Sequence, residues 1–254
     1  MSPALLARAP ALVAESLYRI GPMTPHGEAT HSLEGHLLPV SACPNAWMHI
    51  ARIGADEINE ITAQEGVRLL DMHACLDDHA LKAAVTEWAC DSGLAVQSVA
   101  YRAWYFDCED EDWRYMELNS QEEAEREAAE QDSDSGPDGG PPIEPVLVLK
   151  ASAAAIEQTG AKAFEHLGEQ LAFILLAQTT RPDLHGVYWD ERYDPVSLSA
   201  PRAGLYPDRL GALTSNRITE WPDDEQALDA IRRAAPQPTV TRSVVAQNTL
   251  PGVG

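Results

Sequence analysis

The feature that most limits the fold is an acidic stretch at residues 106–138, which has fourteen acidic side chains and only two basic ones. Unpaired carboxylates are costly to bury, so this stretch must lie at the surface. The whole chain has 40 acidic and 18 basic residues, a formal net charge of −22. More than half of that excess falls within the stretch, which predicts a local acidic insertion.

The charge also excludes classes of partner. A simple nucleic-acid binder needs basic groups that displace phosphate counterions, and an anionic membrane attracts basic segments. We therefore expect no direct nucleic-acid partner and no membrane partner. A basic protein would be attracted to the chain, so residues 106–138 are a candidate binding segment for one.

The arrangement of predicted elements indicates the fold class. Hydrophobic residues make up 44% of the 254 residues, enough to build a core. Strand-like and helix-like stretches mix without the regular alternation of a doubly wound sheet. We therefore predict an α+β fold, with packed helices on a mixed or antiparallel sheet and an acidic, partly disordered insertion.

The domain prediction follows from composition. One domain is expected over residues 1–235, with the acidic insertion or linker at about 119–144 and a C-terminal tail at 236–254. Residues 132–142 are rich in Asp, Ser, Gly and Pro and resemble a linker. A split into two domains at this linker is the alternative.

Local patterns predict several individual elements. Residues 94–106 and 113–118 are rich in Val, Tyr and Trp and predict a hairpin, and Ser120 with Glu123 forms a capping box for a helix. Asp77 or Asp78 can cap a helix that ends near Gly93. Further predictions are strands at 17–20, 36–40, 67–73 and 145–150, and helices at 45–52, 56–64, 153–159, 161–178 and 224–234.

Cysteine usage and hydropathy bear on the compartment. The four cysteines have no paired spacing, which favours buried thiols over a disulfide framework or a zinc site. They are Cys43, Cys75, Cys90 and Cys108. The N-terminus lacks the pattern of a signal peptide, and the longest apolar run, residues 171–177, is too short to span a bilayer. We expect a cytoplasmic protein.

Histidines and carboxylates gather in two places. His26, His31 and His36 stand near Glu28 and Glu34. Imidazole and carboxylate suit zinc, iron or manganese, but the spacing fits no standard helical ligand set. A polar loop of hydrogen-bonding histidines is the preferred interpretation, so the three histidines remain only weak metal candidates and no metal is predicted.

Asp71 and His73 form the second group. They would share one side of the strand predicted at 67–73, with His79 in the first turn of the next helix. Such a pair can act as acid and base. A purely structural pairing is favoured.

The richest candidate site lies at residues 186–203. Tyr188 and Trp189 offer rings that could stack on a base, Arg202 could hold a phosphate, and Glu191 could stabilise a cationic sugar. The alternative is a strand whose aromatic rings complete the core while its charges face water.

In their order along the chain, Arg19, Ser41 and Glu191 resemble the arginine, serine and glutamate of ADP-ribosyltransferase folds. The resemblance implies NAD as a substrate and these three residues as catalytic. The sequence departs from the family pattern, because Ser41 stands in Val-Ser-Ala without Ser-Thr-Ser, and Glu191 stands in Asp-Glu-Arg without Glu-x-Glu. We therefore do not assign the chain to this family.

Three functions remain open at this point. The first is an enzyme acting on a nucleotide-like substrate, with NAD-consuming glycosidic cleavage or ADP-ribosyl transfer as its sharpest form. The second is an acidic interaction protein, such as an antitoxin, an immunity protein or an inhibitor of a nucleic-acid enzyme. The third is a structural subunit that docks through residues 236–254. The sequence leaves the oligomeric state open.

Overall fold

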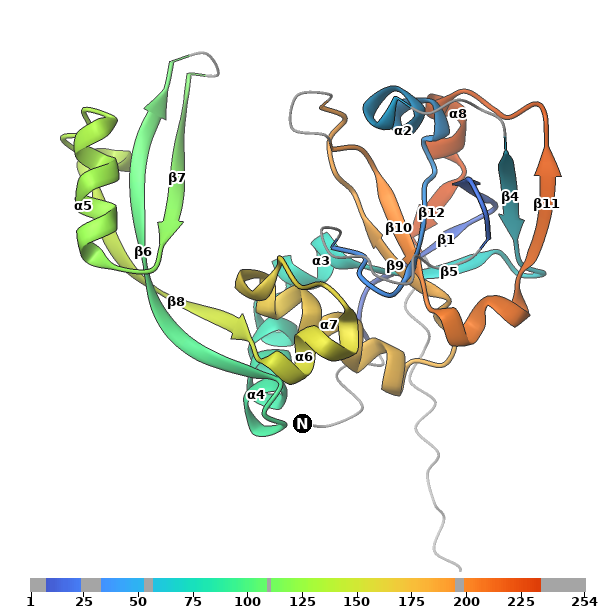
Figure 1. Cartoon of the computed structure of the whole chain (residues 1–254), viewed down its shortest axis with the longest axis horizontal. Helices are drawn as coiled ribbons and strands as arrows, with labels where there is room; N and C mark the ends of the chain where they lie inside the picture. Colours follow the sequence, from blue (N-terminus) through green and yellow to red (C-terminus); the bar gives the residue numbers. More distant parts are fainter. Residues whose placement is uncertain (1–7, 24–32, 53–56, 109–110, 195–198, 234–254) are drawn as a thin grey trace, which may run out of the picture.

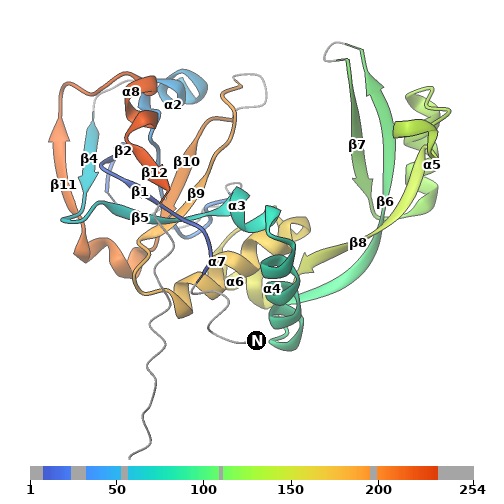
Figure 2. The same ribbon diagram turned by 180° about the vertical axis from the view of Figure 1, so that it is seen from behind.

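The computed structural model describes residues 8–23, 33–52, 57–108, 111–194 and 199–233. It confirms the predicted α+β class, with helices beside mixed and antiparallel sheets. Figures 1 and 2 show two parts, a body and an arm that projects from it. We define the arm as residues 95–151 and the body as the other described residues.

The main sheet of the body has six strands in the order β12-β1-β5-β9-β10-β3. Neighbouring strands are antiparallel except β5 and β9, which run parallel with Asp71 opposite Tyr188. The strands are β1 Ala11–Ala14, β3 Leu38–Val40, β5 Val67–Asp71, β9 Gly186–Trp189, β10 Arg202–Leu205 and β12 Ile231–Arg233.

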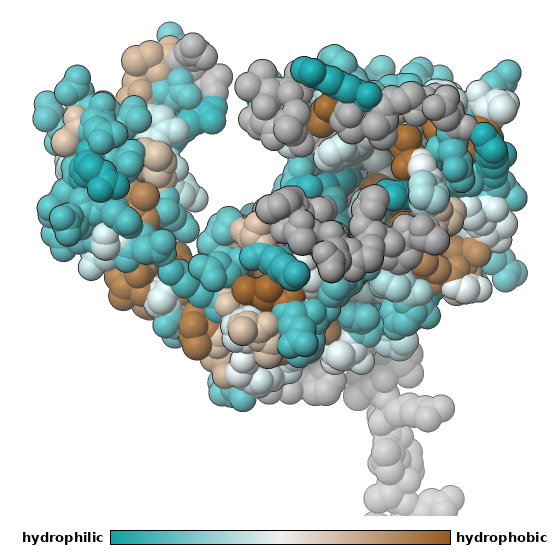
Figure 3. All heavy atoms as spheres, viewed as in Figure 1, coloured by the Kyte–Doolittle hydropathy of each residue, from teal (hydrophilic) through white to brown (hydrophobic). Residues whose placement is uncertain are grey.

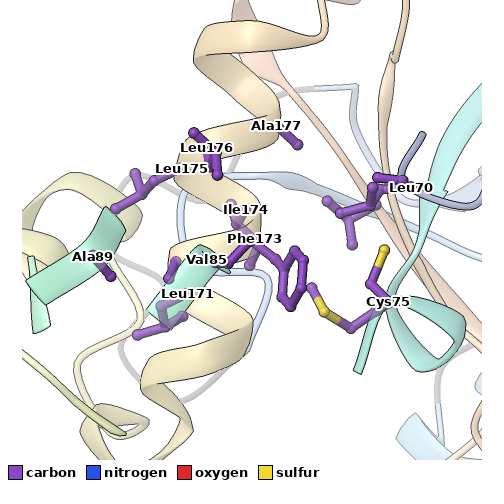
Figure 4. Packing of buried hydrophobic residues seen from close by; sticks show 14 of the residues in the cluster. Leu70, Cys75, Val85, Ala89, Leu171, Phe173, Ile174, Leu175, Leu176 and Ala177 are labelled. Carbon is purple, nitrogen blue, oxygen red and sulfur yellow. The ribbon is translucent and has the colours of Figure 1, made fainter. Parts of the chain in front are cut away.

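Four helices pack on one face of this sheet: α3 Met72–Asp77, α4 His79–Asp91, α6 Ala153–Thr159 and α7 Gly168–Thr180. The predicted cap of α4 is confirmed, since the Asp78 carboxylate accepts hydrogen bonds from Ala80 N and Leu81 N. Residues 171–177 of α7 are all buried. Figure 4 shows Leu70 and Cys75 on one side of α7 and Ala89 on the other, so this helix is packed on several sides.

A three-stranded sheet lies against the other face, with the order β11-β4-β2. Its strands are β2 Leu17–Ile20, β4 Ile58–Thr62 and β11 Thr214–Ile218. The helix predicted at 56–64 is wrong, because Ile58–Thr62 form strand β4. Ile58 and Ile61 point to opposite faces of the strand and join different clusters of the core. Their spacing of three residues is therefore not the spacing of one helix face.

Two short helices lie at the rim of the body, α2 Pro44–Ala51 and α8 Asp224–Asp229. The Asp224 carboxylate accepts hydrogen bonds from Asn45 N at 3.1 Å and Ala46 N at 2.8 Å. This contact joins the first turn of α2 to α8, 179 residues away. Turns of 3-10 helix occupy η2 Glu165–Leu167 and η3 Pro207–Ala212. The helix predicted at 161–178 begins only at Gly168, and the one predicted at 224–234 ends at Asp229.

The arm is a three-stranded sheet in the order β7-β6-β8 with helix α5 beside it. Its elements are β6 Ala95–Asp107, β7 Asp112–Leu118, α5 Gln121–Glu130, η1 Pro137–Gly139 and β8 Ile143–Ala151. The predicted hairpin is confirmed, and so is the Ser120 cap, whose hydroxyl accepts from Glu123 N.

The segment predicted as a linker, 132–142, contains η1 and touches the arm sheet. Trp104 N donates a hydrogen bond to Pro142 O at 2.8 Å, and Gly136 is buried. The described residues of the acidic stretch 106–138 thus form most of the outer part of the arm. Figures 1 and 2 both place β7 on the side nearer the body and α5 on the far side.

Candidate functional site

The first candidate site is a cavity of about 120 Å³ at the rim of the body, which we call the arginine pocket. Elements β2, β3, α2 and β10 supply its walls. An isolated bridge between Tyr18 and Ser41 holds β2 beside the end of β3. The polar and aromatic side chains of its lining are Tyr18, Arg19, Glu34, Ser41, Trp47 and Arg202.

Arg19 is buried and anchored by backbone carbonyls. Its Nε donates to Pro22 O at 3.1 Å and its Nη1 to Pro39 O at 3.0 Å. Burial lowers the pKa of Arg19, and the nearby negative charge of Glu34 opposes that effect. Guanidinium groups stay protonated in proteins, so Arg19 places a fixed positive charge in a mostly apolar wall.

Four charged side chains alternate in sign across the site, and we call them the charge row: Arg19, Glu34, Arg202 and Glu191. Arg202 Nη1 lies 3.4 Å from Glu34 Oε1, and Arg202 Nη2 lies 2.5 Å from Glu191 Oε1. Glu34 is buried, while Arg202 and Glu191 retain about a fifth of their side-chain exposure. Arg202 Nε is buried and has no hydrogen-bond partner among the described residues.

A second cavity of about 620 Å³, the Glu191 pocket, is lined by Glu191, the last member of the charge row. His49 Nδ1 and Tyr193 Oη are 2.5 Å apart at its wall. Burial raises the pKa of Cys43 to about 12, aided by the charges of Asp224 and Asp190. Cys43 is therefore a thiol near neutral pH and is unsuited to act as a nucleophile.

Comparison with protein-family models, with curated proteins and with solved structures finds no match.

The structure brings together four of the predicted site residues. Arg19, Ser41 and Arg202 line the arginine pocket, and Glu191 lines the adjoining Glu191 pocket. The Ser41 hydroxyl is already engaged, since it donates to Pro201 O at 2.7 Å and accepts from Cys43 N at 2.8 Å. These contacts give Ser41 the position of a buried turn residue that shapes the pocket wall.

The two aromatic residues predicted to stack on a substrate lie in the core. Tyr188 is 3% exposed and Trp189 is 1% exposed, and they point to opposite faces of the main sheet. Tyr188 Oη donates to Asp190 Oδ1 at 3.3 Å, and burial raises its pKa. Trp189 Nε1 donates to Gln170 Oε1 at 2.8 Å. Neither ring has a free face, so their predicted stacking has no support in the structure.

Of the three weak metal candidates, only His36 lies within the described residues. His26 and His31 lie outside the described residues, and His36 Nε2 is 3.2 Å from Glu157 O. The described part of the chain holds no group of three His, Cys, Asp or Glu residues suited to a metal ion.

The prediction that Asp71 and His73 share one side of a strand is wrong, because β5 ends at Asp71. The Asp71 carboxylate instead caps α3 by accepting from Ala74 N, and His73 is exposed.

The cysteine prediction holds in part. All four cysteines are free, and Cys43 and Cys75 are buried, but Cys108 is exposed. No helix within the described ranges is long and apolar enough to cross a membrane.

Sequence reasoning missed Tyr18, Trp47 and His49 as neighbours of the site. Trp47 Nε1 donates to Pro201 O at 3.1 Å, a contact between residues 154 positions apart. The bridge between Tyr18 and Ser41 places Tyr18 in the site, and the docking of α2 against β2 and α8 places Trp47 and His49 there. No local pattern in the sequence could reveal that docking.

Proposed function

We propose that this chain is an enzyme acting on a nucleotide-like substrate, with the Arg202–Glu191 ion pair at its reacting centre. One observation carries the proposal. Arg19 and Ser41 line one pocket together with Arg202, which is distant from them in sequence, and Arg202 forms an ion pair with Glu191 of the second pocket. The two members of the ion pair line two different cavities, so a substrate made of two parts could place one part in each cavity.

The guanidinium groups supply the anion-binding part of the proposal. Arginine binds phosphate through paired N–H donors. The two Nη atoms of Arg202 face Glu34 and Glu191, so a phosphate would bind Arg202 by replacing the more exposed of these carboxylates, Glu191. The walls formed by Tyr18 and Trp47 would enclose a flat ring beside this charge.

Glu191 supplies the catalytic part. In NAD-consuming cleavage, the bond between the ribose carbon and the nicotinamide nitrogen breaks, and its electron pair leaves with nicotinamide. The sugar becomes an oxocarbenium-like cation, which a carboxylate stabilises until water or another acceptor adds to it. Glu191 takes this role once a substrate phosphate replaces it as the partner of Arg202.

The experiment uses the purified chain with labelled NAD, with and without a cell lysate as a source of acceptors. Nicotinamide release and label transfer are followed for the parent chain, for Glu191→Gln and for Glu220→Gln. Glu220 is an exposed carboxylate outside both pockets, so it is a matched control.

We expect turnover that falls about a hundredfold or more in Glu191→Gln and is unchanged in Glu220→Gln. Turnover that survives Glu191→Gln would remove Glu191 from the reaction. If the folded parent chain neither turns over nor binds NAD, the NAD form of the proposal is wrong.

The second candidate, an acidic interaction protein, is favoured by a different part of the molecule, the arm. The third candidate depends on residues 236–254, which lie outside the described residues.

A further inference from the structure

Exposed apolar side chains concentrate on the arm. Six large apolar or aromatic residues are exposed in the described part of the chain, and only Tyr193 belongs to the body. The five on the arm are Val96, Val99, Phe106, Tyr115 and Leu147. Figure 3 shows open space between the outer part of the arm and the body, so the body does not cover this region.

Four aromatic rings share one face of the arm sheet, which we call the ring face. Trp104 lies opposite Tyr115 and Phe106 lies opposite Trp113, and alternate residues of a strand point the same way. The ring centroids are 4.9 Å apart in the first pair and 5.6 Å in the second, both edge-to-face. Phe106 and Tyr115 are each almost half exposed.

Helix α5 packs on the opposite face. Ala124 and Ala128 of α5 are buried, and so is Ala103 of β6, which points away from Trp104 and Phe106. The ring face is thus an aromatic sheet surface that helix α5 leaves uncovered. An exposed aromatic patch of this kind marks an interaction site more often than a single exposed residue does.

The ring face already holds one cation from the chain itself. The guanidinium carbon of Arg102 lies 4.5 Å from the centre of the Tyr115 ring. Arg102 Nε is 2.9 Å from Glu117 Oε1, and Arg102 Nη1 is 3.8 Å from Glu144 Oε1. A ring together with nearby carboxylates is the chemistry that recognises guanidinium groups.

The charge of the arm selects the class of partner. Residues 106–138 carry fourteen acidic and two basic side chains, which repel nucleic acid, an anionic membrane and a second copy of this arm. A basic protein is attracted instead. We propose that the ring face binds an arginine-rich segment of a partner protein, whose guanidinium groups lie over the rings and beside the carboxylates. This binding is independent of the two pockets in the body.

The test uses synthetic peptides of nine arginines, nine lysines, and alternating glycine and serine as an uncharged comparison. Binding to the full chain is measured by calorimetry at low and at physiological salt. Two double variants are compared with the parent chain, Phe106→Ser with Tyr115→Ser and Val99→Ser with Leu147→Ser. Val99 and Leu147 are paired, equally exposed or more so, and point to the other face, so they form the matched control.

We expect the arginine peptide to bind more tightly than the lysine peptide, and more weakly as salt rises. The ring-face variant should weaken arginine binding about tenfold or more, whereas the control variant should change it less than about twofold. Circular dichroism and thermal unfolding confirm that both variants fold.

Three outcomes would overturn the inference. The first is no binding of the arginine peptide, and the second is equal binding by both variants, which would show attraction by charge alone. The third is a dimer of the parent chain in sedimentation that only the ring-face variant dissociates, because a second copy would then cover the rings.

Discussion

Glu34 is the residue on which the charge row most depends. It is 5% exposed and stands between two guanidinium groups that are themselves largely buried. A buried charge is tolerated only when opposite charges and hydrogen bonds compensate it. Loss of the Glu34 charge would leave two cations without their shared partner.

Substitution Glu34→Gln should therefore lower the free energy of unfolding by about 3 kcal/mol, as is usual when one partner of a buried ion pair is removed. Glu191→Gln removes a carboxylate that water can partly replace, so this variant should lower the free energy of unfolding by about 1 kcal/mol or less. Urea unfolding of the two variants and the parent chain measures both. Equal losses would show that the burial of Glu34 has no energetic consequence.

His185 gives a prediction about pH. Its Nδ1 accepts a hydrogen bond from Arg68 N at 2.9 Å, which needs the neutral ring. Burial lowers the pKa of His185, and the positive charges of Arg209 and Arg68 lower it further. The unfolded chain thus takes up a proton near the ordinary pKa of about 6.5, before the folded chain does, so stability is lost as the pH falls below that value.

The measurement is urea unfolding at pH 7.5 and pH 5.5 for the parent chain and for His185→Asn, whose amide oxygen can accept the same hydrogen bond. The parent chain should lose more stability on acidification than the variant loses. An identical loss in both would assign the acid sensitivity to other groups.

At the scale of elements, Gly168 lies where helix α7 of the body contacts strand β8 of the arm. It begins α7, and a Cβ at this position would meet the backbone of Leu149 and Ala151 at the base of β8. Backbone cannot move aside as the end of a side chain can. Gly168→Ala should therefore cost about 1–3 kcal/mol of stability through overpacking.

Thermal unfolding measures this loss, with Gly211→Ala as the control, because a Cβ at Gly211 would meet nothing within 4 Å. A Gly168→Ala variant as stable as the control would mean that α7 can shift away from β8 at no cost.

A comparison of the elements shows which sequence patterns are sufficient to predict a helix or a strand. The α4 helix was predictable because the Asp78 cap and the apolar spacing of Leu81 and Val85 agree. The arm hairpin was predictable because two aromatic strands flank a charged turn. Strand β4 was not, because both of its faces are buried and no alternation appears. Strands β1 and β11 were missed too, since each is short and is formed through pairing with distant segments.

The candidate site was predictable only in its charged residues. Arg19 and Arg202 stood out as charges among apolar or aromatic neighbours, and Glu191 stood out within a segment rich in charged and aromatic residues. Their meeting depends on the pairing of β10 with β3 and β9 and on the bridge between Tyr18 and Ser41, which no local pattern encodes. The sequence allowed the rings of Tyr188 and Trp189 either to stack on a substrate or to complete the core. In the structure both rings are buried in the core.

At the scale of the whole molecule, the arm and the body differ in how they are stabilised. Between residues 96 and 148, the buried side chains in the described part of the arm are alanines: Ala100, Ala103, Ala124 and Ala128. The body buries Leu, Ile, Phe and Trp side chains instead. Hydrophobic stabilisation is proportional to the apolar area that is buried. The outer part of the arm buries less of it than the body does, so it should unfold locally at a lower free energy.

Hydrogen exchange should reveal this difference. Amides of β7 and α5 should exchange about a hundredfold faster than those of β5 and β9 at neutral pH, because the arm opens without unfolding the body. Exchange followed by mass spectrometry of peptides resolves the two regions. Equal protection would show that the arm and the body unfold as one unit.

The register at the base of the arm has a further consequence for how such a chain can change. Ala95 and Ala151 are cross-strand partners, so the 57 residues of the arm leave and re-enter the body at adjacent points. A tight two-residue turn would span that gap. Replacing the arm by such a turn would therefore leave the strands and helices of the body and their core in place.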